Sequence, residues 1–356
     1  MQVVTPSSPE ASRDGSLLPT VVYLKGLASE RIGRATDAGI VADLTLRGHV
    51  VLVIDYGRHR EARSPLLNAD ALLIRQSLSG RARDLLPDVP IDPDRLFVVA
   101  EGFTVRRDVV FARDGQRVLG MDLIHPVDPV KAIPLLLEIS CDNVHRMGSA
   151  SLIYCHDTLL DGASAAGFAA AMMDHPVASP YKGLDDPMPE CLERVSAAIA
   201  KSRALARDLG LSARVGAIGF SRGAPFAAIA ALRREVDAAL VHGNRFDYLN
   251  LLPTDPMRER FERAWGPLAA NRQRWAVHGA VSYIDPAVGG ASMFLHTSDA
   301  ESPEYRHGLR RLAEALGAAG IDHVYREDAD GRGHRVTTDP ARLDEIYAFF
   351  RRHLDN

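Results

Sequence analysis

The sequence predicts an α/β protein whose sheet is mostly parallel. Short apolar runs alternate with helical stretches along most of its 356 residues, and this alternation indicates βαβ crossovers. An Asp114-Gly115 turn between two strand-like runs indicates one antiparallel hairpin. The passage from Val215 to Ala231 reads as a short apolar strand, a glycine-flanked turn and an Ala-rich helix. The length allows one large α/β domain or two smaller ones.

The first hundred residues predict a βα unit in front of the main domain. Residues 1–18 show no regular pattern and are expected to be a flexible lead-in, and residues 19–102 alternate between strand and helix patterns. The predicted strands are 20–24, 50–54 and 95–100, and the predicted helices are 29–47 and 66–86. A Glu101-Gly102-Phe103 turn ends the unit without a serine. We therefore expect a non-catalytic accessory unit, or a degenerate half of the main domain.

Residues 103–356 predict the larger, catalytic domain. It opens with the hairpin, whose strands are expected at 105–112 and 118–124. Further strands are predicted at 133–139, from Val215 into the turn, at 236–241, at 292–296 and at 323–326. Helices are predicted at 162–173, 190–209, 251–275, 303–319 and 339–354. Helices between consecutive strands again favour parallel pairing.

Composition and charge argue against several classes of protein. Hydrophobic residues make up 46% of the chain and charged residues 25%, as in ordinary globular proteins. The formal net charge of −4 and the scattered arginines argue against a nucleic-acid partner. The sequence holds no apolar run long enough for a transmembrane helix, so no membrane partner is expected.

The cysteines and the N-terminus bear on the compartment. Cys141, Cys155 and Cys191 give neither a disulfide framework nor the spacing of zinc ligands, and their number favours a reducing compartment. The N-terminus as it stands lacks the charged and apolar regions of a signal peptide. We therefore expect a cytoplasmic protein, or a periplasmic or secreted one if a signal was removed. The sequence leaves oligomerisation open.

The turn Gly219-Phe220-Ser221-Arg222-Gly223 has the G-x-S-x-G pattern of a nucleophile elbow. Ser221 is expected on a strained strand-to-helix turn that exposes its Oγ at the carboxyl edge of the sheet. The flanking glycines suit a turn in which a Cβ would collide with neighbouring elements. The helix N-terminus behind the serine aims backbone N–H groups at developing negative charge. This context favours a catalytic serine over a plain glycine-rich turn.

A serine nucleophile needs a base, and His334 is the predicted one. It lies in a Gly-rich loop between the last predicted strand and the last helix. An imidazole titrates near neutral pH, so it can take up and return a proton. His296 and His307 are weaker rivals, because the first lies in a predicted strand and the second on a helix face.

The acid that orients the base is expected just after the strand at 292–296. Asp299 stands there and is the first choice, because its carboxylate would fix the tautomer of the histidine and stabilise the imidazolium. Glu301, two residues on, is the close rival. Asp247, after the preceding strand, is the third option. Asp299 would otherwise serve as a helix cap or turn residue.

The remaining site residues are inferred from their positions in the chain. One oxyanion donor is expected to be the backbone N–H of Arg222, and the second is expected from Cys141 or Asp142 in the loop after the strand at 133–139. Candidate substrate contacts are His242, Tyr248 and Trp265. The constellation requires no metal and no cofactor.

Taken together, residues 103–354 resemble the α/β-hydrolase superfamily, and they look most like bacterial carbohydrate (acetyl-xylan-type) esterases and dienelactone-hydrolase-like proteins. The resemblance rests on the hairpin, the elbow at 219–223, Asp299 with Pro303, Gly333-His334, and the stretch from Tyr181-Lys182-Gly183 to Arg194 before a long helix. It implies a three-layer α/β-hydrolase sandwich with an antiparallel opening hairpin, preceded by the N-terminal βα extension.

The resemblance and the residues together predict a serine esterase that forms an acyl-enzyme. Its expected substrate is a small-molecule or carbohydrate ester, an acetylated sugar for example. A serine peptidase or another acyl hydrolase on the same fold is one alternative, since a fold does not fix its chemistry. A non-catalytic binding protein with a hydrolase fold is another, and the complete Ser-acid-His order argues against it.

Overall fold

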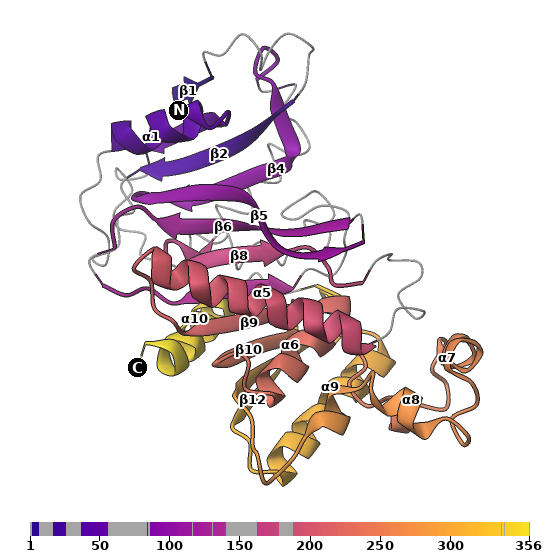
Figure 1. The fold of residues 1–356 in the computed structure, drawn as a ribbon. Coiled ribbons are helices and arrows are strands. Elements are labelled where there is room, and N and C mark those ends of the chain that lie inside the picture. Colours follow the sequence, from indigo (N-terminus) through magenta and orange to yellow (C-terminus); the bar gives the residue numbers. More distant parts are fainter. Residues whose placement is uncertain are drawn as a thin grey trace.

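The computed structural model describes residues 2–6, 17–25, 37–55, 84, 86–115, 117–129, 131–139, 162–177, 188–335, 337 and 339–355. Within these residues the chain builds two sheets, and their strands succeed one another from one end of the molecule to the other (Figure 1). The predicted helix 66–86 falls almost wholly outside the described residues.

The first sheet has four strands in the order β1-β3-β2-β4. Its bounds are β1 Gln2–Val4, β2 Leu18–Lys25, β3 Val50–Asp55 and β4 Ile91–Ala100. The strands β2, β3 and β4 pair in parallel, and α1 (Asp37–Leu46) connects β2 to β3. Residues 2–4 were expected to belong to the flexible lead-in, but they pair antiparallel with β3 as an edge strand.

The second sheet has eight strands in the order β12-β11-β10-β9-β7-β8-β6-β5. Its bounds are β5 Phe103–Asp114, β6 Arg117–Pro126, β7 Leu135–Ile139, β8 Ala169–Met173, β9 Val215–Phe220, β10 Ala238–His242, β11 Ser292–Ser298 and β12 His323–Asp328. The hairpin β5-β6 is antiparallel as predicted, and so is the pair β6-β8. All other pairs in this sheet are parallel.

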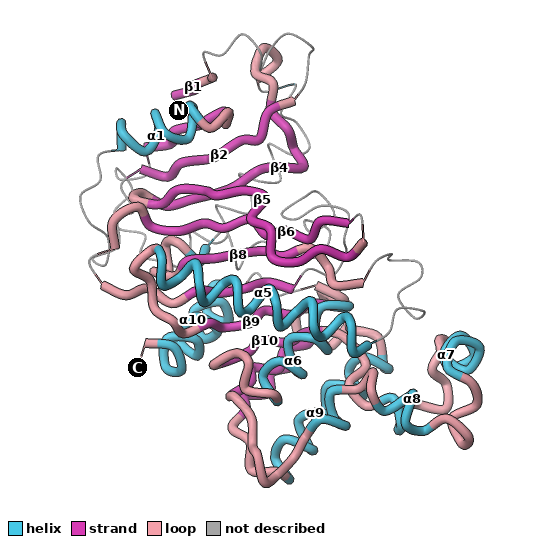
Figure 2. The backbone as a smooth tube through the Cα atoms, in the orientation of Figure 1, coloured by secondary structure: helices cyan, strands magenta, loops and turns pink. Residues whose placement is uncertain are grey.

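Helices cover both faces of the second sheet and complete three layers (Figures 1 and 2). Buried side chains of α5 (Met188–Asp208), α6 (Ala224–Leu232) and α9 (Pro303–Ala318) pack in one core with one face of the sheet. Those of α10 (Pro340–Leu354) pack in a second core against the other face. Within the described residues, none of the helices is both long and apolar enough to span a bilayer.

The two sheets share one of these cores. Side chains of β2, α1 and β4 are buried together with those of β5, β6 and α10. At the junction Tyr23 donates a hydrogen bond from its hydroxyl to Asp37 and accepts one from the N–H of Gly102, at 2.8 and 3.0 Å. Burial is the main reason why the pKa of Tyr23 rises well above its ordinary value. The division into units at residue 102 stays a prediction.

Two segments differ from the sequence-based assignment. Residues 162–173 were expected to be helical because they are small, but Ala169–Met173 forms the fully buried strand β8. A short apolar run of this kind fits either a buried strand or a buried helix, since periodicity alone does not separate them. Residues 251–275 were expected to be mostly helical, and they hold only α7 (Arg258–Trp265) and α8 (Arg272–Ala276).

Candidate active site

Ser221 lies at the carboxyl end of β9, where the chain turns into a 3-10 turn (Ser221–Gly223) and then into α6. Its φ of 49° lies in the left-handed region, which is strained for a residue that has a side chain. A nucleophile elbow requires this conformation. A Cβ on Gly219 would stand 2.6 Å from the Cβ of Ala227 and 2.7 Å from the Cα of Ala224. The glycine is therefore needed for the close packing of β9 on α6.

His334 reaches Ser221 from the loop between β12 and α10. Its Nε2 lies 2.9 Å from the Oγ of Ser221, and its Nδ1 lies 2.6 Å from Oε2 of Glu301. A carboxylate accepts hydrogen bonds, so Nδ1 carries the hydrogen and Nε2 is left with the lone pair that faces the serine hydroxyl. This is the tautomer that a general base needs.

The carboxylate on His334 belongs to Glu301 and not to Asp299, the first choice of the sequence analysis. Asp299 instead accepts hydrogen bonds at Oδ1 from the N–H of Gly331, at 3.0 Å, and from the hydroxyl of Ser298, at 3.3 Å. It thereby braces the loop that carries His334. Glu301 is 4% exposed, and its longer side chain spans the distance to the imidazole.

The other candidates for acid and base take structural positions. Asp247 is buried and accepts hydrogen bonds from Leu249 N–H and the amide of Asn250. The Nε2 of His307 contacts the carbonyl of Asn250 at 2.9 Å. Neither residue takes the position of acid or base at Ser221. His296 lies within β11 and contacts His242.

The oxyanion site is described only in part. Arg222 comes directly after the nucleophile, in the 3-10 turn that leads into the N-terminus of α6, so its N–H is the first candidate oxyanion donor. The amide of Asn244 donates a hydrogen bond to the carbonyl of Ser221 at 2.6 Å and so holds the turn from the β10 side. Cys141 and Asp142, the candidates for the second donor, lie outside the described residues.

His242 was expected to line the substrate pocket, but it lies beneath the catalytic residues. It is 1% exposed, and its ring stacks on Phe220 with 4.9 Å between the centroids. Its Nδ1 is 2.8 Å from Nδ1 of His296, and its Nε2 is 3.8 Å from Oε2 of Glu301. Sequence reasoning missed this histidine pair, although both residues stand near the ends of adjacent parallel strands.

One metal-like cluster exists among the described residues, and it coincides with this arrangement. His242, Glu301 and His334 offer ligand atoms that all lie within 4.8 Å of one another. The Nε2 of His334 contacts Ser221 and its Nδ1 contacts Glu301, so both ring nitrogens have a partner in the cluster. A relay of protons from Ser221 to His334 therefore explains why these side chains lie together.

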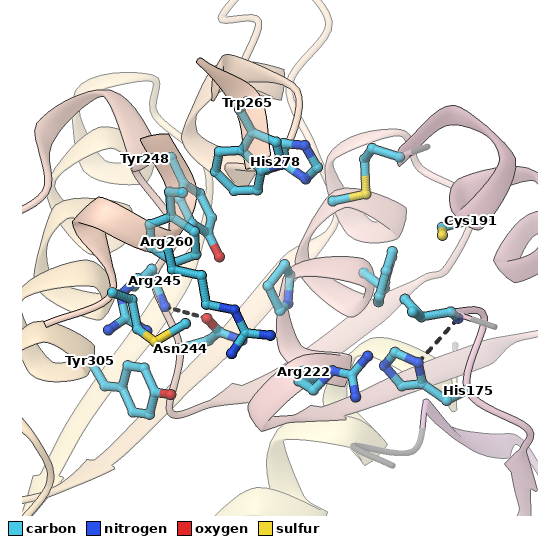
Figure 3. A pocket seen from close by; sticks show the side chains of 16 residues that line it. His175, Cys191, Arg222, Asn244, Arg245, Tyr248, Arg260, Trp265, His278 and Tyr305 are labelled. Carbon is cyan, nitrogen blue, oxygen red and sulfur yellow. Dashed lines mark hydrogen bonds between the residues drawn. The ribbon is translucent and has the colours of Figure 1, made fainter. Parts of the chain in front are cut away.

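A cavity of about 260 Å³ opens next to the elbow between α5 and the segment from η3 (Tyr248–Asn250) to α8 (Figure 3). Its described lining includes Arg222, Phe226, Arg245, Tyr248, Arg260, Trp265, His278 and Tyr305. Tyr248 and Trp265, two candidate substrate contacts of the sequence analysis, belong to this lining, and the side chain of Trp265 is 1% exposed. Their role as substrate contacts stays a prediction. The rings of Trp265 and His278 stack with their centroids 3.9 Å apart.

The charge of the cavity comes from its arginines. Figure 3 shows the guanidinium groups of Arg222 and Arg260 directed into the space, while Arg245 binds the buried Asp255 through two hydrogen bonds. Burial lowers the pKa of His278 to about 4, so this ring is neutral near pH 7. The cavity therefore offers several N–H donors beside an aromatic wall.

No family model and no curated protein matches the sequence. Solved structures do match the fold. A truncated carbohydrate esterase from gut microbiota is 15% identical with a TM-score of 0.54, over 71% of this chain and 97% of that one. One of two fungal esterases from Rhizomucor miehei is 16% identical with a TM-score of 0.53, over 82% and 97%. An acylaminoacyl peptidase from Pyrococcus horikoshii is 15% identical with a TM-score of 0.57, over 71% and 42%.

Some of the matching proteins are much longer than this chain, which covers 38% of a bifunctional GH43-CE protein from Bacteroides eggerthii at 21% identity and a TM-score of 0.54. At such low identities the likeness concerns the fold. The mostly parallel sheet, the opening hairpin and the helices on both faces agree with it. The chain has the α/β-hydrolase fold.

Proposed function

We propose that the chain is a serine hydrolase that cleaves carboxylic esters through an acyl-enzyme. The observation that carries the proposal is the unbroken contact chain from the Oγ of Ser221 through His334 to the carboxylate of Glu301, at 2.9 and 2.6 Å. Together these groups provide a nucleophile, a base in the correct tautomer and an acid that orients it.

In the first half of the reaction Ser221 attacks the ester carbonyl while Nε2 of His334 takes up the hydroxyl proton. The negative charge that develops on the carbonyl oxygen is stabilised by the N–H of Arg222 at the helix N-terminus. Glu301 stabilises the imidazolium that forms. When the tetrahedral adduct collapses, His334 gives the proton to the leaving alcohol, and an ester of Ser221 remains.

In the second half water replaces the alcohol. His334 again accepts a proton, now from water, and the hydroxide equivalent attacks the acyl-enzyme. Collapse of the second adduct breaks the bond to Ser221, and the proton returns from His334 to the serine oxygen. The carboxylic acid leaves, and the enzyme regains its starting state.

The cavity supports a carbohydrate ester as the substrate. Tyr248 is half-buried and gives the cavity an aromatic ring that a sugar can contact, while Trp265, 1% exposed and stacked on Phe261 and His278, supports that wall from behind. The guanidinium N–H groups of Arg222 and Arg260 can donate to hydroxyl or carbonyl oxygens. The carbohydrate esterase among the proteins of similar fold agrees with this choice. A peptidase is the second candidate, because acylaminoacyl and prolyl peptidases also share the fold.

The test is a substrate panel with the purified chain: an acetylated xylo-oligosaccharide, p-nitrophenyl acetate and an aminoacyl p-nitroanilide. We expect hydrolysis of both esters, a higher kcat/KM for the sugar ester, and a loss of about 10⁴-fold or more in kcat for Ser221→Ala. Ser282→Ala, a change of the same kind elsewhere in the chain, is the control. Preference for the anilide would favour the peptidase, and full activity in Ser221→Ala would refute the mechanism.

A further inference from the structure

Two buried histidines form a pair directly beneath Glu301. His242 ends β10, His296 lies on β11, and the two are register partners in the parallel ladder. Their side chains are 1% exposed, their rings stack with 5.0 Å between the centroids, and their Nδ1 atoms are 2.8 Å apart. Neither histidine belongs to the described lining of the cavity, so the pair is expected to act on the reaction through its neighbours.

Each end of the pair faces a carboxylate. The Nε2 of His296 lies 2.9 Å from Oδ2 of Asp328, which Arg342 also binds at Oδ1. Hydrogen bonds from His296 and Arg342 hold the pKa of Asp328 far below its ordinary value, against the effect of its burial, so this group is ionised. The Nε2 of His242 lies 3.8 Å from Oε2 of Glu301, the oxygen that also binds His334.

The number of hydrogens on the pair decides its charge. The Nδ1–Nδ1 contact needs one hydrogen between the two nitrogens, and Asp328 requires another on Nε2 of His296. With only these two, the pair is neutral, and the lone pair on Nε2 of His242 faces the carboxylate of Glu301. A third hydrogen on that nitrogen replaces this repulsion with an attraction between opposite charges, in a buried place where both effects are strong.

We propose that the His242–His296 pair holds three hydrogens and one positive charge at neutral pH, and that this charge positions Glu301 as a carboxylate beneath His334. The role rests on the proposed function, because it acts through the acid of the catalytic triad. His242 and His296 are positioning residues in this role. The charge itself can be measured without any hydrolysis.

The surroundings of the pair agree with a single positive charge. Glu301 and Asp328 face it from the loop after β11 and from β12, and Arg342 of α10 lies behind Asp328. Arg326, the register neighbour of His296 on β12, is paired with Glu345. Phe220, at the end of β9, stacks on the ring of His242. The centroid of the His334 ring lies 6.1 Å from that of His242. Among these groups two carboxylates act directly on the pair.

The first experiment counts the hydrogens on the ring nitrogens. The protein is labelled with ¹⁵N-histidine, and long-range ¹H–¹⁵N correlation spectra are recorded at pH 7, with the His242→Asn and His296→Asn variants used for assignment. We expect three of the four ring nitrogens of His242 and His296 to carry hydrogen. Two hydrogens on the pair would overturn the proposal, whether or not the protein hydrolyses esters.

The second experiment tests what the charge does. His296→Asn keeps an N–H donor for Nδ1 of His242 and removes the positive charge, while His323→Asn at the opposite end of the strands is the control for the same change. The charge opposes protonation of His334, so its removal should move the acidic limb of kcat/KM to higher pH by about one unit. The control should leave the limb in place.

The possible results separate the two proposals. A folded His296→Asn variant whose activity falls at every pH with an unmoved acidic limb would contradict the positioning role, because a merely structural residue behaves in that way. If the variant fails to fold, the hydrogen count on the unchanged protein decides. If the unchanged protein hydrolyses no ester, the proposed function fails, and the count still tells whether the pair is charged.

Discussion

Two strand ends in this molecule have the same local signal and different outcomes. After β9 the chain reaches Ser221 with a φ of 49° and enters α6. After β4 it reaches Gly102 with a φ of 86° and turns directly into β5. The first turn exposes a side chain above a helix N-terminus. The second returns the chain to the next sheet, and Gly102 N–H is taken up by the hydroxyl of Tyr23. The element that comes after the turn, a helix or a strand, therefore decides whether a strand end can carry a nucleophile.

The difference extends to the two sheets. At the carboxyl end of β9, β10 and β11 polar side chains gather under Ser221, and several of them are buried: His242, His296 and Glu301. Along the described residues of β2 and β4 the buried side chains are apolar apart from Thr20 and the hydroxyl of Tyr23. Burial of polar groups lowers the stability of the first region, whereas apolar packing raises the stability of the second. Substitutions in the two regions should therefore affect different measurements.

Among the substitutions that compare these two regions, the largest effect is expected for the acid. Glu301→Gln removes the charge that stabilises the imidazolium and changes the tautomer of His334, so kcat/KM for p-nitrophenyl acetate should fall by about 10³-fold. Asp299→Asn, which only weakens the brace on the loop of His334, should cost less than about tenfold. The reverse ranking of these two variants would return the role of the acid to Asp299.

The next effect distinguishes two glycines with positive φ. At Gly243, with a φ of 59°, a Cβ would stand 2.8 Å from the ring of His334, whereas at Gly48, with a φ of 82°, it would meet nothing within 4 Å. Both Ala variants should lose about 1 kcal/mol of stability through backbone strain. Only Gly243→Ala should lose activity, by about 100-fold, because His334 is displaced. Thermal melting and kcat/KM measured on the same samples check this, and equal activities would break the comparison.

Acid should weaken the N-terminal unit through His49. Burial lowers its pKa from 6.5 to about 4, so between these values the unfolded chain binds a proton that the folded one does not. The contribution of His49 to the free energy of unfolding is fully present above pH 6.5, and it is lost as the pH falls toward 4. Urea unfolding at pH 7 and pH 4.5 should show a fall that is about 2 kcal/mol smaller in His49→Asn. An identical fall in both proteins would contradict the assignment.

The smallest effect is expected at the junction of the sheets. Tyr23→Phe deletes the hydroxyl that bridges Asp37 and Gly102, and it should cost about 1 kcal/mol in the free energy of unfolding. The value of kcat/KM should stay unchanged, since the junction lies away from the cavity. A clear change in kcat/KM with little change in stability would mean that the N-terminal unit shapes the site.

Much of this architecture could be predicted from the sequence, because the signals are local. Residues next to one another in the sequence indicate the Asp114-Gly115 turn, the apolar strands and the elbow at Ser221. The geometry also brings His334 to Ser221, as its place in a Gly-rich loop after the last strand indicated. Strand β8 was missed because Ala169–Met173 is a short run of apolar residues only, which fits either a helix or a strand.

The acid could not be predicted, because two carboxylates lie within three residues of the end of β11. Which of them meets His334 depends on how the loop packs. Asp299 is drawn to Gly331 N–H, and Glu301 turns inward. The histidine pair was missed for a related reason. His242 and His296 are far apart in sequence, and only the register of β10 with β11 places their rings together.

The most direct test of the catalytic triad is labelling with a fluorophosphonate, followed by mass spectrometry of the intact and digested protein. The triad predicts one adduct per chain, at Ser221, formed far more slowly in His334→Ala and about as fast in His323→Asn as in the unchanged protein. A folded protein that forms no adduct, or that is labelled at another residue, would contradict it.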